Sequence, residues 1–226
     1  MTTLAVALAE AKKLLFLISN TPELDAALIL AHVLSQERSY IFAYPDQKLT
    51  KEQQEYYEKL LDKRIKKIPL AYLLGKKEFW SQSFTVNPSV LIPRPETELL
   101  VEKILEHHGH LKNLCGIDLG TGSGAIVISL ADNTQAWNFI GIDKYKDALN
   151  LARWNAANLL KKVRRTLKDQ DFLKYDFSTE GKPTVTTSIR ATLQSISEIG
   201  LRIELSSCLN PSKNLFCRKA EIERQT

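Results

Sequence analysis

The stretch Cys115-Gly-Ile-Asp-Leu-Gly-Thr-Gly-Ser-Gly124 joins a short apolar segment to a tight glycine-rich turn. The residues that follow predict an apolar helix over 125–131, a second strand over Phe139-Ile-Gly-Ile-Asp143 and a further helix from Lys146 to about Leu160. Strands that alternate with helices in this way are typical of a parallel, doubly wound sheet. The sequence therefore predicts an α/β domain around this stretch.

The turn Gly120-Thr-Gly-Ser-Gly124 is expected to lie between a strand and a helix. Glycine lets the backbone approach a ligand closely, and the amides of a helix N-terminus point at it. Asp143 follows Gly120 by 23 residues and comes at the end of the next strand. From that position a carboxylate accepts hydrogen bonds from ribose hydroxyls. These features predict a cofactor that contains adenosine, bound at the carboxyl ends of the strands.

Two classes of cofactor fit such a turn. The spacing Gly120-x-Gly122-x-x-Ala125 matches the dinucleotide fingerprint, which leaves an NAD-dependent oxidoreductase open as a minor alternative. Asp118 favours the other class, because its carboxylate would repel a pyrophosphate and suits the ammonium and sulfonium groups of S-adenosylmethionine. A third alternative is a plain turn whose glycines only shape the backbone and whose acidic side chains are solvated.

Residues 1–75 have the apolar spacing of helices. Three segments place apolar or aromatic side chains at intervals of three and four: Leu4, Leu8, Ala11, Leu15 and Ile18; then Leu24, Ala27, Leu28, Ala31 and Leu34; then Tyr56, Tyr57, Leu60, Leu61 and Ile65. Thr50 and Gln53 have the form of a capping box before the third segment, and Pro69 ends it. The pattern predicts a small helical bundle, followed over Lys76 to Val90 by short strands.

The composition excludes several classes of protein. With 44% hydrophobic and 25% charged residues over 226 positions, the chain can form a core, which excludes disorder throughout. No run approaches the roughly 18–20 apolar residues of a membrane span, and residues 1–10 lack the basic region of a signal peptide. Three unpatterned Cys residues favour a reducing compartment. We therefore expect a cytoplasmic protein without a membrane partner. We also expect a monomer that has no DNA partner.

A metal site is not expected either. His107, His108 and His110 surround Gly109 at the end of a predicted helix, where His is common, and the Cys residues have no matching spacing. The net charge of +5 permits an acidic or RNA-bearing partner without requiring one.

Three segments together resemble one protein family. They are Leu91-Ile-Pro-Arg-Pro-Glu-Thr-Glu98, Asp118-Leu-Gly-Thr-Gly-Ser-Gly124 and Gly141-Ile-Asp143, and their order and spacing resemble the HemK/PrmC family. Members of this family are protein-(glutamine-N5) methyltransferases that act on peptide chain release factors. Similarity at Pro69-Leu-Ala-Tyr-Leu-Leu-Gly75 and Phe84-Thr-Val-Asn-Pro88 extends the resemblance over about residues 1–160.

The resemblance implies a domain order and a set of site residues. The domains are a helical substrate-recognition domain over 1–75, a hairpin linker over 76–98 and a Rossmann-like methyltransferase core over 99–177. The implied cofactor is S-adenosylmethionine, whose methyl group is transferred to a glutamine side-chain amide of a release factor. The implied cofactor-binding residues are Asp118, Gly120, Thr121, Gly122, Ser123 and Gly124 at the methionine part, Asp143 at the ribose and Phe172 beside the adenine.

The chain departs from the family at the catalytic signature. The family carries Asn-Pro-Pro-Tyr after the fourth strand, and the resemblance assigns to this motif the orientation of the substrate amide. Residues 180–190 contain no Asn, no Pro-Pro and no aromatic residue, and Asn210-Pro211 lies too far downstream. Ser and Thr supply 13 of the 49 residues over 178–226, against 17 of the preceding 177. No catalytic residue is assigned.

This departure affects what we expect of the structure and how the possible functions are weighed. We expect an incomplete methyltransferase domain, a reading frame that leaves the family's between about 161 and 178, and an atypical tail over 178–226. The leading function is a release factor glutamine methyltransferase. The alternative is a catalytically inactive remnant that still binds the cofactor or a release factor, and the absence of the motif favours it over an active enzyme. Asp118 and residues 91–98 favour both over the oxidoreductase.

Overall fold

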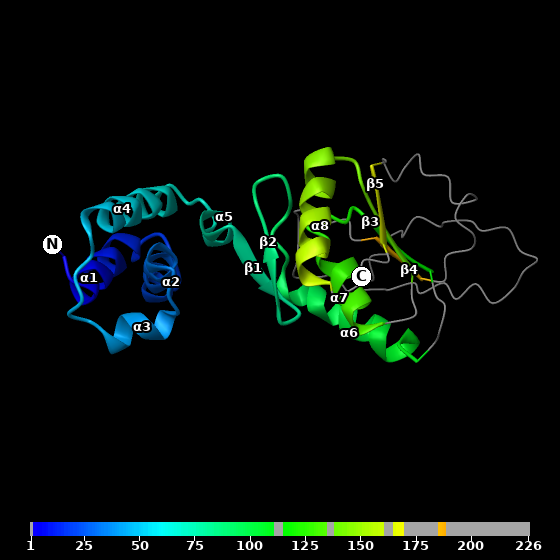
Figure 1. Cartoon of the computed structure of the whole chain (residues 1–226), viewed down its shortest axis with the longest axis horizontal. Helices are drawn as coiled ribbons and strands as arrows, with labels where there is room; N and C mark the ends of the chain where they lie inside the picture. The colour runs from blue at the N-terminus through cyan, green and yellow to red at the C-terminus, as the bar shows by residue number, and fades with distance from the viewer. Residues whose placement is uncertain (1, 111–114, 135–137, 161–164, 170–184, 189–226) are drawn as a thin grey trace, which may run out of the picture. The chain divides into compact units, whose positions relative to one another are not determined.

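The computed structural model describes residues 2–110, 115–134, 138–160, 165–169 and 185–188 (Figure 1). Its contacts divide the chain into two units. The helical unit comprises Met1–Lys77 with Val86–Pro88, and the sheet unit comprises Glu78–Thr85 with Ser89–Thr226. Within the described ranges, none of the helices is long and apolar enough to cross a membrane.

The helical unit, blue to cyan in Figure 1, confirms the predicted all-helical region. Its described helices are α1 (Leu4–Leu15), α2 (Pro22–Leu34), α3 (Arg38–Ala43), α4 (Lys51–Ile65) and α5 (Leu70–Leu74). The predicted capping box begins α4: Thr50 Oγ1 accepts from Gln53 N at 3.1 Å, and Gln53 Oε1 accepts from Thr50 N at 3.0 Å. The apolar stripes meet in one core that includes Leu4, Leu15, Ile29, Leu30, Ile41 and Leu60.

Buried polar bonds connect α2 to α4. Arg64 Nε lies 2.8 Å from Asp25 Oδ2, and the two side chains are only 16% and 7% exposed. Arg64 also donates from Nη1 to the carbonyl of Ile68 at 3.3 Å. The hydroxyl of Tyr57 donates to the carbonyl of Ala26 at 3.2 Å, and burial raises the pKa of Tyr57 well above its usual value. The ion pair between Arg64 and Asp25 and the bond from Tyr57 to Ala26 give these buried polar groups partners, so they stabilise this arrangement of the helices.

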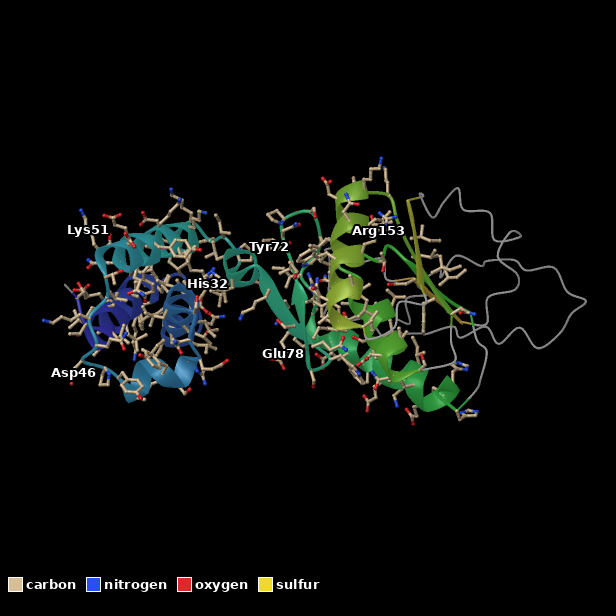
Figure 2. The ribbon with its side chains drawn as sticks, in the orientation of Figure 1. His32, Asp46, Lys51, Tyr72, Glu78 and Arg153 are labelled. Carbon is tan, nitrogen blue, oxygen red and sulfur yellow. The ribbon has the colours of Figure 1, made fainter. Side chains whose placement is uncertain are left out.

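The same two helices also meet nearer the surface. The hydroxyl of Tyr56 lies 3.4 Å from Nε2 of His32, which is labelled in Figure 2. Partial burial lowers the pKa of His32, and the positive charge of Lys76 lowers it further. Because the ordinary pKa of His is already near 6.5, this contact is made by a neutral imidazole at pH 7.

Removing the charge of Asp25 should destabilise the helical unit by about 2–3 kcal/mol, since an unpaired partner then stays buried. Asp25→Asn keeps the shape of the side chain but leaves the Arg64 guanidinium facing a neutral amide. The measurement is the free energy of opening from hydrogen exchange of amides in α2 and α4. The control is Glu23→Gln on the same helix, whose partner Lys12 is half exposed; it should cost less than about 1 kcal/mol. Equal losses would contradict the expectation.

A hairpin follows the helices, with strands β1 (Lys76–Phe79) and β2 (Gln82–Thr85). Trp80 and Ser81 form its turn with φ of 51° and 57°. Two-residue hairpin turns of this kind require positive φ at both central positions. Trp80 therefore lies in the turn, although aromatic residues favour strands. Its backbone N–H donates to Glu98 Oε1 at 3.0 Å.

The sheet unit contains a parallel four-stranded sheet, which confirms the predicted Rossmann-like α/β architecture. Its strands are β3 (Cys115–Leu119), β4 (Asn138–Asp143), β5 (Arg165–Asp169) and β6 (Val185–Ser188). Its helices are α6 (Glu98–His108), which follows the 3-10 turn η1 (Pro95–Thr97), with α7 (Ala125–Asn133) and α8 (Lys146–Leu159). The crossovers from β3 to β4 and from β4 to β5 contain α7 and α8, respectively.

The two faces of β3 and β4 have different surroundings. Ile117 pairs with Ile140 and Leu119 with Ile142, and these four side chains form a cluster of their own. Phe139 belongs to the opposite face, where it clusters with apolar residues of α6, α7 and α8. Successive side chains of a strand point to opposite faces, which separates the two clusters.

In the strand order β5-β4-β3-β6, successive strands of the chain are added first on one side of β3 and then on the other. β4 and β5 lie on one side of β3, whereas β6 lies on the other, with Ser188 in register with Leu119. Ligands of open α/β sheets bind outside the carboxyl ends of the strands at such a switch point. The glycine-rich turn that follows β3 lies at this edge.

The structure differs from the predicted division of the chain in two places. Residues Glu78–Thr85 group with the sheet unit rather than with a separate linker over 76–98, because β2 is bonded to α8. β6 lies beyond residue 177, where the sequence analysis ended the methyltransferase core, and pairs with β3. Val185-Thr-Thr-Ser188 contains one apolar residue, so hydrophobic alternation gave no signal for this strand.

Candidate functional site

The glycine-rich turn is bonded to the end of β4. Gly120 N and Thr121 N both donate to the carbonyl of Ile142, at 2.8 and 3.0 Å. Gly124 N donates to the carbonyl of Thr121 at 2.8 Å, and the carbonyl of Gly124 accepts from Ile128 N at 2.9 Å in the first turn of α7. The turn is therefore fixed to β4 on one side and continues directly into α7 on the other.

Two glycines of the turn are needed for different reasons. Gly124 has φ +80°, and a Cβ there would lie 2.7 Å from Ile128 Cδ1 and 3.3 Å from Ala152 Cβ. Gly120 has φ +79°, but a Cβ there would meet nothing within 4 Å. Packing therefore leaves no room for a side chain at Gly124. The space beside Gly120 is open, so a ligand can approach the backbone there.

Substituting these glycines should separate strain from crowding. Gly124→Ala places an alanine at positive φ and presses its Cβ against Ile128, so the sheet unit should lose about 2–4 kcal/mol of stability. Gly120→Ala brings only the strain of positive φ and should cost about 1 kcal/mol. Hydrogen exchange of amides in β3 and β4 measures both losses under the same conditions. An equal loss in the two variants would show that Gly124 is not held in a packed position.

Asp143 ends β4 and holds the turn as well. Its Oδ2 accepts from Gly122 N at 2.9 Å and its Oδ1 accepts from Tyr145 N at 3.0 Å. The residue is 8% exposed. A carboxylate offers about four acceptor positions, so two N–H bonds leave capacity for hydroxyl groups of a ligand. Asp143, for which ribose binding stays a prediction, fixes the peptide group before Gly122.

Asp118, in β3, is hydrogen-bonded to the turn. Its Oδ2 accepts from the hydroxyl of Thr121 at 2.9 Å, and the two residues are only 4% and 6% exposed. Asp118 and Asp143 thus place two carboxyl groups at the carboxyl edge of neighbouring strands. Such an edge favours a ligand with hydroxyl donors and positive charge over a ligand with two phosphate groups.

α8 contributes a residue that no sequence motif identified. Asn155, which is 1% exposed, donates from Nδ2 to the carbonyl of Ser123 at 2.9 Å and to the carbonyl of Thr85 at 2.9 Å. Its Oδ1 accepts from Thr85 N at 2.8 Å. A signal was present, because Asn155 interrupts the apolar stripe of α8 and a buried amide needs partners. The stripe residues are Leu151, Ala152 and Ala156.

Seven of the eight predicted cofactor-binding residues lie in the described part of the chain. They are Asp118, Gly120, Thr121, Gly122, Ser123, Gly124 and Asp143, and the fold brings them together at the carboxyl ends of β3 and β4. Phe172 lies outside the described residues, so its place beside the adenine stays a prediction. Among the residues described, no three His, Cys, Asp or Glu side chains are grouped so that they could hold a metal ion.

Two family models match the sequence. Residues 6–75 match the PrmC N-terminal domain, and residues 110–194 match a methyltransferase domain. The second match continues past residues 161–178, the interval in which we expect the reading frame to leave that of the family.

Relatives with curated names agree with these matches, and a solved structure is similar in part. The release factor glutamine methyltransferase of Coxiella burnetii is 45% identical over 139 residues, which are 62% of this chain and 50% of that protein. That of Escherichia coli is 42% identical over 142 residues, with 62% and 50% covered. An RNA methyltransferase of Salinibacter ruber, solved in complex with S-adenosyl-L-homocysteine, is 29% identical over 43% of this chain and 60% of that one, with a TM-score of 0.37.

The chain spans about half the length of the curated relatives it matches. Within that span both domain types are present in the order that the sequence motifs predicted. By its sequence the chain is similar to release factor glutamine methyltransferases, and it matches both the PrmC N-terminal domain and a methyltransferase domain.

Proposed function

We propose that the chain binds S-adenosylmethionine at the turn after β3 and uses it to methylate a glutamine side-chain amide of peptide chain release factors. The bond from Gly122 N to Asp143 Oδ2, 2.9 Å long, carries the proposal. It fixes an open glycine-rich turn beside a buried carboxylate at the carboxyl edge of a parallel sheet. The names of the curated relatives supply the reaction and the substrate.

The residues of the turn suit this cofactor. The remaining acceptor positions of Asp143 can bind the two ribose hydroxyls, and the carboxylate of Asp118 can attract the cationic methionine part. The free space at Gly120 leaves room for the ligand beside the backbone. S-adenosylmethionine, when bound, supplies an electrophilic methyl group.

The acceptor nitrogen needs orientation by the protein. An amide nitrogen is a poor nucleophile because its lone pair is delocalised into the carbonyl, so the transfer depends on positioning. β6 ends at Ser188, beside the end of β3, and Ile189-Arg-Ala-Thr192 follows it in the sequence. These four residues offer no amide side chain and no aromatic ring. This observation favours a second candidate function, in which the chain binds cofactor or release factor without efficient transfer.

Recognition of the release factor is assigned to the helical unit. Its match to the PrmC N-terminal domain supports the assignment. A shallow, open hollow of about 460 Å³ lies on the surface of this unit. The hollow is lined by Lys12, Thr21, Pro22, Glu23, Leu24, Ala27, Arg38 and Phe42. Leu24 and Phe42 are 38% and 54% exposed. Apolar side chains framed by charged ones are typical of a protein-binding surface.

The test is transfer of a radiolabelled methyl group from S-adenosylmethionine to a purified release factor, with mass spectrometry to locate the label. A release factor with that glutamine replaced by asparagine is the control. Label on the glutamine of the unaltered release factor alone would support the proposed reaction. Binding of S-adenosyl-L-homocysteine without any label would support the second candidate, and failure of both would reject the two.

A further inference from the structure

The side chain of Asn155 connects three parts of the sheet unit. It extends from α8, bonds both backbone groups of Thr85 in β2 and reaches the carbonyl of Ser123 in the glycine-rich turn. Thr85 N can only donate, so it determines that Oδ1 faces β2. Nδ2 then has two hydrogens for two carbonyls. Every group in this network is satisfied, and the orientation of the amide is fixed.

The bond to Ser123 restrains a particular peptide group. The carbonyl of Ser123 and the N–H of Gly124 belong to one planar peptide unit. Asn155 Nδ2 holds the carbonyl end at 2.9 Å, while the N–H end donates to the carbonyl of Thr121 at 2.8 Å. The peptide group on the other side of Gly122 is held separately by Asp143. The turn is therefore held at two points on either side of Gly122.

We propose that Asn155 is a positioning residue, which sets the glycine-rich turn in the conformation that binds the cofactor. The inference rests on the proposed function of the turn. The two bonds to Thr85 in β2 fix the orientation of the Asn155 amide. The position of the Ser123 carbonyl is therefore determined relative to β2. Among the hydrogen bonds of the described residues, Asn155 touches no part of the cofactor site except this backbone carbonyl.

The test uses the full chain and the isosteric variant Asn155→Asp. A carboxylate has no hydrogen for the carbonyls of Ser123 and Thr85, so both bonds from Nδ2 are lost. The dissociation constant of S-adenosyl-L-homocysteine should rise about 10- to 100-fold, as expected when two buried bonds are removed. The matched control is Asn158→Asp on the exposed side of α8, where Nδ2 donates only to Trp154 O at 2.7 Å. It should change the constant by less than about twofold.

Hydrogen exchange without ligand is the second readout. In Asn155→Asp the amides of Gly122 and Gly124 should exchange at least about tenfold faster, while amides within β4 keep their rates, because only the turn is released. Unchanged binding of S-adenosyl-L-homocysteine, or equally faster exchange throughout the sheet unit, would overturn the proposal.

Two further outcomes are also decisive. If the unaltered chain does not bind S-adenosyl-L-homocysteine, the proposed function fails, and the exchange of the turn amides alone decides the role of Asn155. If Asn155→Asp unfolds the sheet unit, Asn155→Ala takes its place under the same two criteria, since a water molecule can then bond the exposed carbonyls.

Discussion

Replacing Asp143 by Ala is expected to weaken the binding of S-adenosyl-L-homocysteine about 100- to 1,000-fold, or about 3–4 kcal/mol. The carboxylate would accept the ribose hydroxyls, and it already accepts from Gly122 N and Tyr145 N. The variant therefore loses the bonds to the ligand and releases the turn at the same time. Titration calorimetry of the full chain measures the effect.

Asp147→Ala is the matched control for Asp143→Ala. Asp147 is an exposed acid in the first turn of α8, so its removal changes the net charge by the same amount. It should alter the dissociation constant by less than about twofold, because exposed charges contribute little. Equal weakening in the two variants would mean that only the overall charge matters.

The chain is expected to methylate a release factor at least about 1,000-fold more slowly than a full-length relative, since each 1.36 kcal/mol of lost positioning costs about tenfold in rate. The glycine-rich turn and Asp143 supply the cofactor half of the site. Ile189-Arg-Ala-Thr192, which follows β6, has no group that can orient the substrate amide. The measurement is the initial rate of methyl transfer at saturating cofactor.

A chimera provides the control for this rate. Residues 161–226 are replaced by the corresponding segment of the Escherichia coli relative, while residues 1–160 keep the helical unit, the turn and Asp143. The chimera should recover most of the rate of the full-length relative. A chimera as slow as the chain itself would place the defect before residue 161. A fast unaltered chain would show that its own C-terminal residues orient the amide.

The local features of the fold could be predicted from the sequence. The turn over 120–124, the strand that ends at Asp143 and the helix from Lys146 all lie where spacing and turn chemistry placed them. The clustering of Asp118 with Asp143 could also be predicted, because the carboxyl ends of neighbouring parallel strands meet at one edge. These inferences depend on neighbours in sequence or on the general rules of parallel sheets.

Features that depend on distant partners could not be predicted. Asn155 and Thr85 are 70 residues apart, and nothing in the spacing of either one identifies the other. The same holds for the bond from Gly122 to Asp143, which gives the expected ribose acceptor an additional structural role. The sequence predicts short strands over Lys76 to Val90, but the two-residue turn and the bond to Glu98 place Trp80 at the tip of the hairpin, between the two strands.

Titration calorimetry of the unaltered full chain with S-adenosyl-L-homocysteine and, separately, with NAD tests the choice of cofactor most directly. The carboxylates of Asp118 and Asp143 should accept hydroxyls and positive charge and should repel a pyrophosphate. S-adenosyl-L-homocysteine should therefore bind at least about 100-fold more tightly than NAD, a difference of about 2.7 kcal/mol. Tighter binding of NAD would contradict the assignment of this turn to S-adenosylmethionine.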